Sequence, residues 1–223
     1  MERHFHEELR RLTNRVGDMG ALVETRTRDA LTALVERRAD LALQVAAGDA
    51  DVNELELEID DLCMKFLATQ GPLAADLRLV RSVIRVIIDL ERIGDQAVNM
   101  AHTIIGLVNK PPLKPVFDIG NLGDIALQML HESVQSFVRQ DVSLVRIVLE
   151  QEEKADALRD SIFRVLLTHM MSDPATIERA LGLLLVSRSL ERIADHATNI
   201  AEEAEFVAEG RVIRHRKNAL EAE

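Results

Sequence analysis

The sequence predicts an all-α protein built as two tandem, pseudo-symmetric three-helix bundles, with six helices in all. Three observations predict this fold. Aromatic residues make up only 3% of the 223-residue chain, with no Trp or Tyr, and this composition favours helices over strands. Apolar residues recur at steps of three and four over long stretches. The stretch DLERIGDQAVNMA at 89–101 returns as SLERIADHATNIA at 189–201, with eight of thirteen positions identical.

The first half contains three predicted helices, over residues 5–37, 39–70 and 73–109. Its second helix aligns without gaps on the second half, since LALQVAAGDADVN at 41–53 lies opposite LVRIVLEQEEKAD at 144–156. The third helix begins after the breaker QGP, and its apolar seam runs through Leu77, Val80, Ile84, Ile87, position 91, Gly94, Val98, Ala101 and Ile105. Helices of about 30 residues are roughly 45 Å long, so each half should be an elongated bundle.

The stretch NKPPLKPVFDIGN at 109–121 is the linker, because its prolines favour an extended backbone. The second half then repeats the pattern with helices over 120–139, 142–171 and 175–210, the last one following SDP as the third follows QGP. We therefore predict a first bundle over 1–110, a linker over 111–118, a second bundle over 119–210 and a charged tail over 211–223. The basic segment RVIRHRKN in that tail is interpreted as a solvated end, with contact to anionic lipid or a partner as the alternative.

Composition excludes several classes of protein. The formal charge of −11 argues against a general nucleic-acid binder, because affinity for phosphates needs a basic surface. The single cysteine, Cys63, cannot form an internal disulfide and is expected to pack in the core in a reducing compartment. The start MERHFHEEL lacks the apolar segment of a signal peptide, and the longest uncharged run, 96–109, is too short and polar to span a bilayer. We expect a soluble cytoplasmic protein that meets membranes only through partners or peripheral contact.

Acidic residues interrupt the apolar seam of the third helix. Position 91 holds Glu91 and Asp95 follows one turn later, although a carboxylate on a packed seam is costly without a partner. The same steps recur at equivalent places in both halves: Asp49 and Asn53, Glu91 and Asp95 with Asn99, Glu152 and Asp156, Glu191 and Asp195 with Asn199. Oxygen donors one turn apart on neighbouring helices suit cations such as Mg, Ca, Mn, Fe or Zn.

Spacing alone leaves ion pairing open as the alternative. Arg92 and Arg192 directly follow the glutamates and should point elsewhere on the helix, which makes Arg85 and Arg188 the nearer candidate partners. His196 is either an auxiliary metal ligand or a surface histidine. A di-iron oxidase is excluded because none of the seven histidines has a Glu three residues before it. Phosphate-binding, nucleophile-elbow, zincin and C-x-x-C motifs are also absent from the sequence, so no enzymatic activity is expected.

The duplicated motifs DLERIGDQAVNMA and SLERIADHATNIAEE resemble those of the PhoU family of bacterial phosphate-signalling regulators. So do VNELELEIDDLCMKFLATQGPLAADLRLV and LLTHMMSDPATIERAL, and the resemblance extends over roughly residues 5–210. It implies tandem three-helix bundles that commonly form homodimers. It also implies a negative regulator of phosphate uptake and phosphate-starvation signalling, which links the Pst transporter ATPase to the phosphate-sensing histidine kinase.

The resemblance further implies metal ions, as Fe, Zn, Mn or Mg, bound singly or as multinuclear clusters by paired E/D-xxx-D motifs. In this sequence those motifs are Glu91 with Asp95, Glu191 with Asp195, and Glu152 with Asp156. The fourth motif reads Asp49 to Asn53, so one carboxylate is an amide, and the first site should bind a divalent metal more weakly than the second. Glu56 and Asp60, together with Asn99, Asn199 and His196, are candidate auxiliary ligands. The alternatives are a helical interaction protein without metal and a carboxylate-bridged metalloenzyme.

Overall fold

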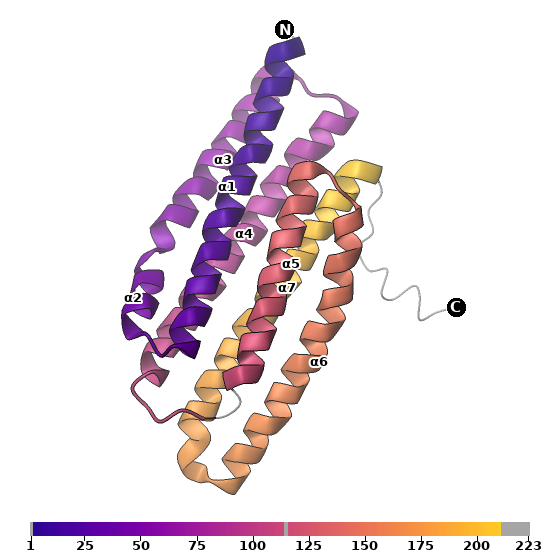
Figure 1. Ribbon diagram of the computed structural model, residues 1–223. Helices are drawn as coiled ribbons and strands as arrows, with labels where there is room; N and C mark the ends of the chain where they lie inside the picture. Colours follow the sequence, from indigo (N-terminus) through magenta and orange to yellow (C-terminus); the bar gives the residue numbers. More distant parts are fainter. Residues whose placement is uncertain (1, 114–115, 211–223) are drawn as a thin grey trace, which may run out of the picture.

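The computed structural model of the chain describes residues 2–113 and 116–210, apart from the side chains of residues 2–6, 49, 116 and 117. These residues form seven α-helices and a short 3-10 turn (Figure 1): α1 Glu2–Val35, α2 Ala39–Ala47, α3 Asp49–Gln70, α4 Ala74–Leu107, α5 Val116–Arg139, α6 Ser143–Ser172, η1 Pro174–Thr176 and α7 Ile177–Glu209. The described residues contain no strand, and the prediction of an all-α fold is confirmed.

The predicted helix over 39–70 is divided in two at Gly48. This residue has φ −92° and ψ 8°, so it lies outside helical geometry and separates α2 from α3. A Cβ added at Gly48 would lie 3.0 Å from Cζ of Arg26, whose buried guanidinium donates from Nη2 to Asp51 Oδ2 at 2.7 Å. Glycine at this position therefore leaves room for a buried arginine that connects α1 with α3.

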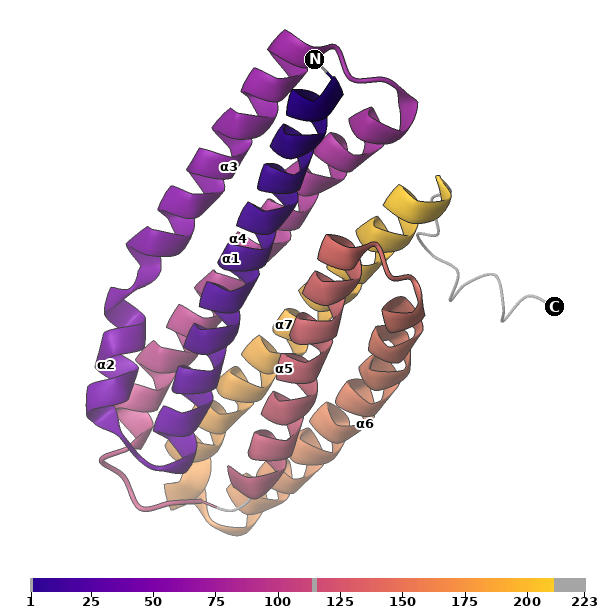
Figure 2. The same ribbon diagram turned by 45° about the horizontal axis from the view of Figure 1, so that its top comes forward.

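The chain forms two halves, α1–α4 and α5–α7, that pack side by side, and α2 and α3 together take the place of one helix (Figures 1 and 2). Helices α1 and α4 of the first half pack against α5 and α7 of the second half. Helices α2 and α3 cover α1 and α4 on the outside, and α6 covers α5 and α7. The buried apolar residues of both halves belong to one continuous core. The tandem arrangement is confirmed, while the interface between the halves is itself part of the core.

Two reciprocal contacts between α1 and α5 show the internal pseudo-symmetry. A Cβ at Gly20 would lie 2.8 Å from Cγ1 of Val134, and a Cβ at Gly123 would overlap the side chain of Leu31. Residues 20 and 123 are 103 positions apart, and so are residues 31 and 134. Each half therefore inserts an apolar side chain over a glycine of the other half, as in a symmetric dimer interface.

A buried carboxylate joins α7 to α4. The side chain of Glu203 is only 4% exposed and accepts hydrogen bonds from Arg81 Nη1 at 2.9 Å and Arg85 Nη1 at 3.3 Å. Ser82 Oγ donates to the same carboxylate at 2.7 Å, and the Arg81 guanidinium lies 4.6 Å from the ring centre of Phe206. A buried charge needs such partners, so this group fixes how the two halves meet at one end of the α4–α7 interface.

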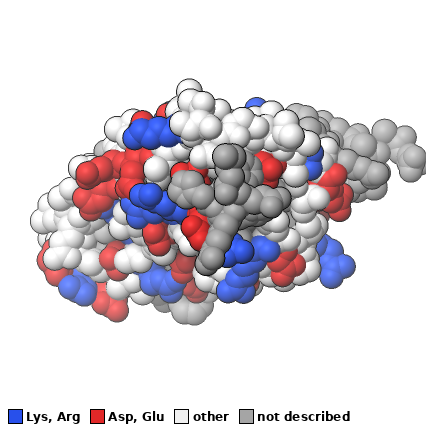
Figure 3. Space-filling view, turned by 90° about the horizontal axis from the view of Figure 1, so that it is seen from above, with Lys and Arg blue, Asp and Glu red and all other residues white. Residues whose placement is uncertain are grey.

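The helices and the surface can be compared with two predictions, the absence of a membrane-spanning segment and of a broad basic surface. Among residues 2–113 and 116–210, no helix has the length and apolar character that crossing a bilayer requires. Figure 3 shows acidic and basic side chains interspersed over one end of the molecule, with no broad basic area on that face. The predicted basic tail segment, 211–218, lies outside the described residues, and the remaining domain boundaries stay predictions.

Candidate functional site

The predicted acidic residues of the second half gather between α6 and α7. Helix α6 carries Glu152 and Asp156, and α7 carries Glu191 and Asp195. Between the acids, each helix carries a small, buried alanine, Ala155 on α6 and Ala194 on α7.

Electrostatics show that the four carboxylates interact. Burial raises the pKa of Asp195, and repulsion from Glu191, Asp156 and Glu152 raises it further, with a smaller opposing effect of His196. Like charges within a few ångströms disfavour the ionised form. The four carboxylates therefore lie near one another, as their spacing along the two helices predicts.

Arg159 on α6 provides positive charge at this cluster. Its Nε atom lies 3.7 Å from Glu191 Oε1, and its Nη2 atom lies 3.9 Å from Asp156 Oδ1 and 3.5 Å from Asp160 Oδ1. The sequence analysis did not identify Arg159. The internal repeat could have indicated it, because the position 103 residues earlier holds Glu56. One half therefore has an arginine where the other has an acid.

The first half brings a related set together between α3 and α4. Burial raises the pKa of Glu56, with repulsion from Asp60 and Asp95 acting in the same direction and Arg92 opposing it. Glu56 and Asp60 therefore lie near Asp95, as expected of auxiliary residues. Val52 packs at Gly94, where a Cβ would lie 3.2 Å from Val52 Cγ1, and this contact sets α3 close to α4.

The prediction of which arginines contact the acids of the first half was wrong. Arg92 does not point away from the acids: its Nε lies 3.4 Å from Glu91 Oε2, and its Nη1 lies 3.6 Å from Asp95 Oδ2. A long side chain reaches neighbours on its own helix that its Cα–Cβ direction alone would exclude. Arg85 instead contacts Glu203. Arg188 forms no ion pair with any residue that the structure describes.

A metal requires a closer arrangement than the one observed. Within the described part of the chain, no three His, Cys, Asp or Glu side chains converge on a point where they could hold an ion. Asp49 begins α3, but its side chain lies outside the described residues. The carboxylates of two neighbouring helices repel one another, and carboxylate oxygens are ligands that suit a hard cation. To let an ion bind, the side chains of Arg92 and Arg159 would have to move away from these carboxylates.

His196 and Asn199 of α7 both contact Asp89 of α4. Nδ1 of His196 lies 2.8 Å from Asp89 Oδ1, and Asn199 Nδ2 donates to the same oxygen at 3.2 Å. Both side chains of α7 thus connect to α4 of the other half. These contacts form a polar link between the halves, and a role of the two residues as auxiliary metal ligands stays a prediction. Asn99 lies in a separate cleft between α4 and α7.

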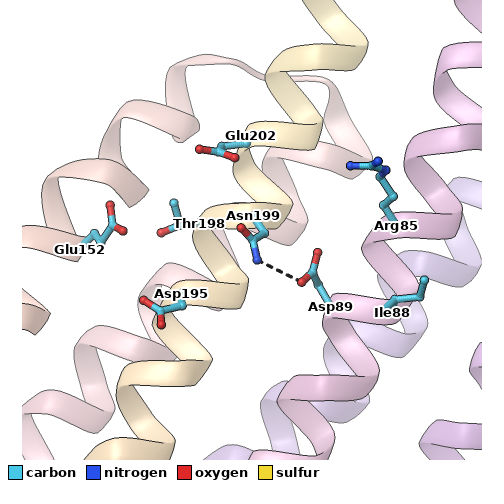
Figure 4. A pocket seen from close by; sticks show the side chains of 8 residues that line it. All are labelled: Arg85, Ile88, Asp89, Glu152, Asp195, Thr198, Asn199 and Glu202. Carbon is cyan, nitrogen blue, oxygen red and sulfur yellow. Dashed lines mark hydrogen bonds between the residues drawn. The ribbon is translucent and has the colours of Figure 1, made fainter. Parts of the chain in front are cut away.

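An acidic cleft of about 580 Å³ adjoins the cluster (Figure 4). Its lining consists of Arg85, Ile88 and Asp89 from α4, Glu152 from α6, and Asp195, Thr198, Asn199 and Glu202 from α7. Figure 4 shows Asp195 and Thr198 on the side of α7 toward Glu152, and Asn199 directed at Asp89. Sequence reasoning missed Asp89, Thr198 and Glu202, although Asp89 opens the duplicated motif whose second copy begins with Ser189.

Cys63 has no features of a catalytic nucleophile. The side chain is fully buried, and burial raises the pKa of its thiol to about 12, with the Asp60 carboxylate adding to the shift. A nucleophilic cysteine needs a lowered pKa and access to substrate. Cys63 is therefore a core residue, as the sequence analysis expected.

Comparisons with known proteins cover nearly the whole chain. The PhoU domain family profile matches residues 16–104 and 119–204, one domain in each half. The phosphate-specific transport system accessory protein PhoU of Escherichia coli K12 is 36% identical over 95% of this chain and 88% of its own. The PhoU homolog of Aquifex aeolicus is 38% identical over 94% of this chain and 95% of its own.

Solved structures agree with these matches. The crystal structure of PhoU from Pseudomonas aeruginosa superposes with a TM-score of 0.90 at 36% identity, and covers 93% of this chain and 100% of that one. The phosphate transport system regulatory protein PhoU from Streptococcus pneumoniae has a TM-score of 0.86 at 26% identity, with 94% and 99% coverage. Sequence and structure match in both halves, and the chain belongs to the PhoU family.

Proposed function

We propose that this protein is a non-enzymatic regulator that accompanies a phosphate-specific transport system. The observation that carries the proposal is the match of both halves, in sequence and in fold, to proteins named as accessory or regulatory proteins of phosphate transport. The buried, high-pKa Cys63 agrees with a role in binding rather than covalent catalysis.

The finer role is that of a negative regulator. The protein would contact the transporter ATPase and the phosphate-sensing histidine kinase from the cytoplasm and hold the kinase inactive when phosphate is plentiful. Two similar but non-identical halves support this role, because they offer two different surfaces for two partners. Assembly as a homodimer belongs to the same proposal.

The acidic clusters are proposed to bind divalent or trivalent metal. Glu152, Asp156, Glu191 and Asp195 would hold the ion in the second half. The first-half residues would be Asp49, Asn53, Glu91 and Asp95, with Glu56 and Asp60 close by. A bound cation would neutralise carboxylates that repel one another, and thus stabilise the protein by linkage. Arg159 lowers the negative charge of the second cluster, as Arg92 does in the first, so the ranking of the second site as the stronger stays a prediction.

A second candidate is a helical interaction protein without metal, and the contacts of Arg92 and Arg159 with the acids favour it. Elemental analysis of protein purified without chelator separates the two readings, together with melting curves with and without Mn, Zn or Fe. Metal binding predicts a higher melting temperature in the parent, and the rise at the second site should vanish when Glu191→Ala and Asp195→Ala are combined. Ion pairing predicts no metal response and a less stable double variant.

The regulatory role has its own test, which does not depend on metal. A strain lacking the gene should express a phosphate-starvation reporter in phosphate-rich medium, and crosslinking should recover the kinase or the transporter ATPase. A reporter that stays repressed in the deletion strain contradicts the proposed regulation.

A further inference from the structure

A second cleft lies farther along the α4–α7 interface, with a volume of about 450 Å³. Helix α4 lines it with Gln96, Asn99 and His102 among others, and α7 contributes Arg188, Ser189 and Arg192. Two of these side chains, Arg188 and Arg192, are cationic. No carboxylate belongs to the lining, which is unusual for a chain with a net charge of −11.

Internal duplication supplies a direct comparison for this cleft. The 100-residue offset of the repeated motif relates it to the acidic cleft of Figure 4, since Asn99 corresponds to Asn199, which lines that cleft. At three further positions the charge becomes more positive in the basic cleft, whereas Arg85 of the acidic cleft corresponds to the neutral Leu185. Ile88 of the acidic cleft corresponds to Arg188, Asp89 to Ser189, and Glu202 to His102. The two clefts thus lie on equivalent parts of α4 and α7, but one is lined mainly by acidic residues and the other by basic ones.

The two arginines of the basic cleft are available for an anion. Neither Arg188 nor Arg192 forms an ion pair with a residue in the described ranges. Their counterparts show that this is specific to the cleft: Arg92, which corresponds to Arg192, lies 3.4 Å from Glu91 and 3.6 Å from Asp95. The guanidinium of Arg85, at the same end of the acidic cleft, is bound to Glu203.

We propose that the cleft formed by Gln96, Asn99, His102, Arg188, Ser189 and Arg192 binds a small inorganic oxyanion of the phosphate or sulfate type. Arg188 and Arg192 are four residues apart, so they project from the same face of α7, where like charges repel unless an anion lies between them. Guanidinium groups bind tetrahedral oxyanions through paired, charge-assisted hydrogen bonds. The amides and the Ser189 hydroxyl add neutral donors at the wall.

The lining also defines what the cleft should not select. No Phe, Tyr or Trp lines it, so it offers no platform on which a nucleotide base could stack. Without a carboxylate it has no strong acceptor for the proton of hydrogen phosphate. Sulfate should therefore compete with phosphate. This inference does not depend on the proposed metal sites, which face α3 and α6.

The test is a titration of the full-length, chelator-treated protein with sodium phosphate at constant ionic strength, followed by calorimetry and by amide chemical shifts. Saturable binding with shifts centred on residues 96–103 and 185–192 is expected, and sulfate should displace phosphate. Arg188→Gln and Arg192→Gln should each weaken binding about tenfold, since each removes a charge-assisted hydrogen-bonding group.

Arg164→Gln is the matched control. Arg164 is an exposed arginine of α6 outside the cleft, so the control removes the same charge and should leave the affinity unchanged. Equal weakening in all three variants would mean general charge attraction and would overturn the proposal. Shifts that do not saturate, or that centre elsewhere, would overturn it as well. If the metal-free protein binds phosphate in this cleft, the proposal holds even when no metal binds to the acidic clusters.

Discussion

Replacing Glu203 should test how the two halves are held together. In Glu203→Ala, Ser82 loses a buried acceptor, and Arg81 and Arg85 lose a carboxylate whose side chain is only 4% exposed. Removing one member of a buried charge pair costs about 3–5 kcal/mol. Both arginine side chains are 39% exposed and can be hydrated after the change, so we expect a smaller loss of about 2–3 kcal/mol in the free energy of unfolding.

Urea unfolding followed by far-UV circular dichroism measures this loss, because the chain has no Trp or Tyr for fluorescence. Glu203→Gln keeps an acceptor for Ser82 and should lose about half as much. Glu153→Ala removes an exposed glutamate of α6 and should change the stability by less than about 0.5 kcal/mol. If Glu203→Ala unfolds at the same urea concentration as Glu153→Ala, the carboxylate does not hold α4 and α7 together and our reasoning is wrong.

Three further predictions follow from particular contacts. Asp195→Asn should stabilise the metal-free protein at pH 7, because the raised pKa of Asp195 makes its ionised form unfavourable in the folded state. This gain in the free energy of unfolding should shrink as the pH falls toward about 4, since the folded state then takes up a proton before the unfolded one. A gain that does not vary with pH in urea titrations contradicts this. Gly20→Ala should cost about 1–2 kcal/mol against the stiff Val134, whereas Gly106→Ala, with no atom within 4 Å of the added Cβ, should be stabilising, and melting temperatures compare the two. Cys63 should react with a disulfide reagent only after unfolding, so rapid labelling of the native protein at pH 8 would contradict its burial.

Periodicity and the repeated motif were enough to predict the helices and their division into halves, because both depend on local spacing. Of the predicted seam of α4, Val80, Ile87, Gly94 and Ala101 are buried, whereas Ile84, Val98 and Ile105 are half-buried and Leu77 is 49% exposed. The break at Gly48 could not be predicted in the same way, since a helix tolerates an isolated glycine. It depends on Arg26, which is distant in sequence and reaches that point only in the folded chain.

The candidate site was predictable to the extent that it follows helix faces. The acids of α6 and α7 lie together because one-turn spacing and the duplication placed them so. The arginines could not be assigned, since a long side chain chooses among several neighbours, and Arg92 reaches both acids beside it. The contacts of Glu203, Asp89 and His196 were not predicted, because their partners belong to the other half. The spacing of residues along one helix does not determine the angle at which the two halves pack.

Asp195 and His196 are consecutive residues of α7, and their side chains bind in opposite directions. Asp195 interacts with the acids of α6, while His196 contacts Asp89 on α4. A helix turns by roughly 100° per residue as a rigid rod, so α7 cannot rotate about its axis to suit one contact without displacing the other. A change of charge beside α6 would therefore also act on the contact between His196 and Asp89.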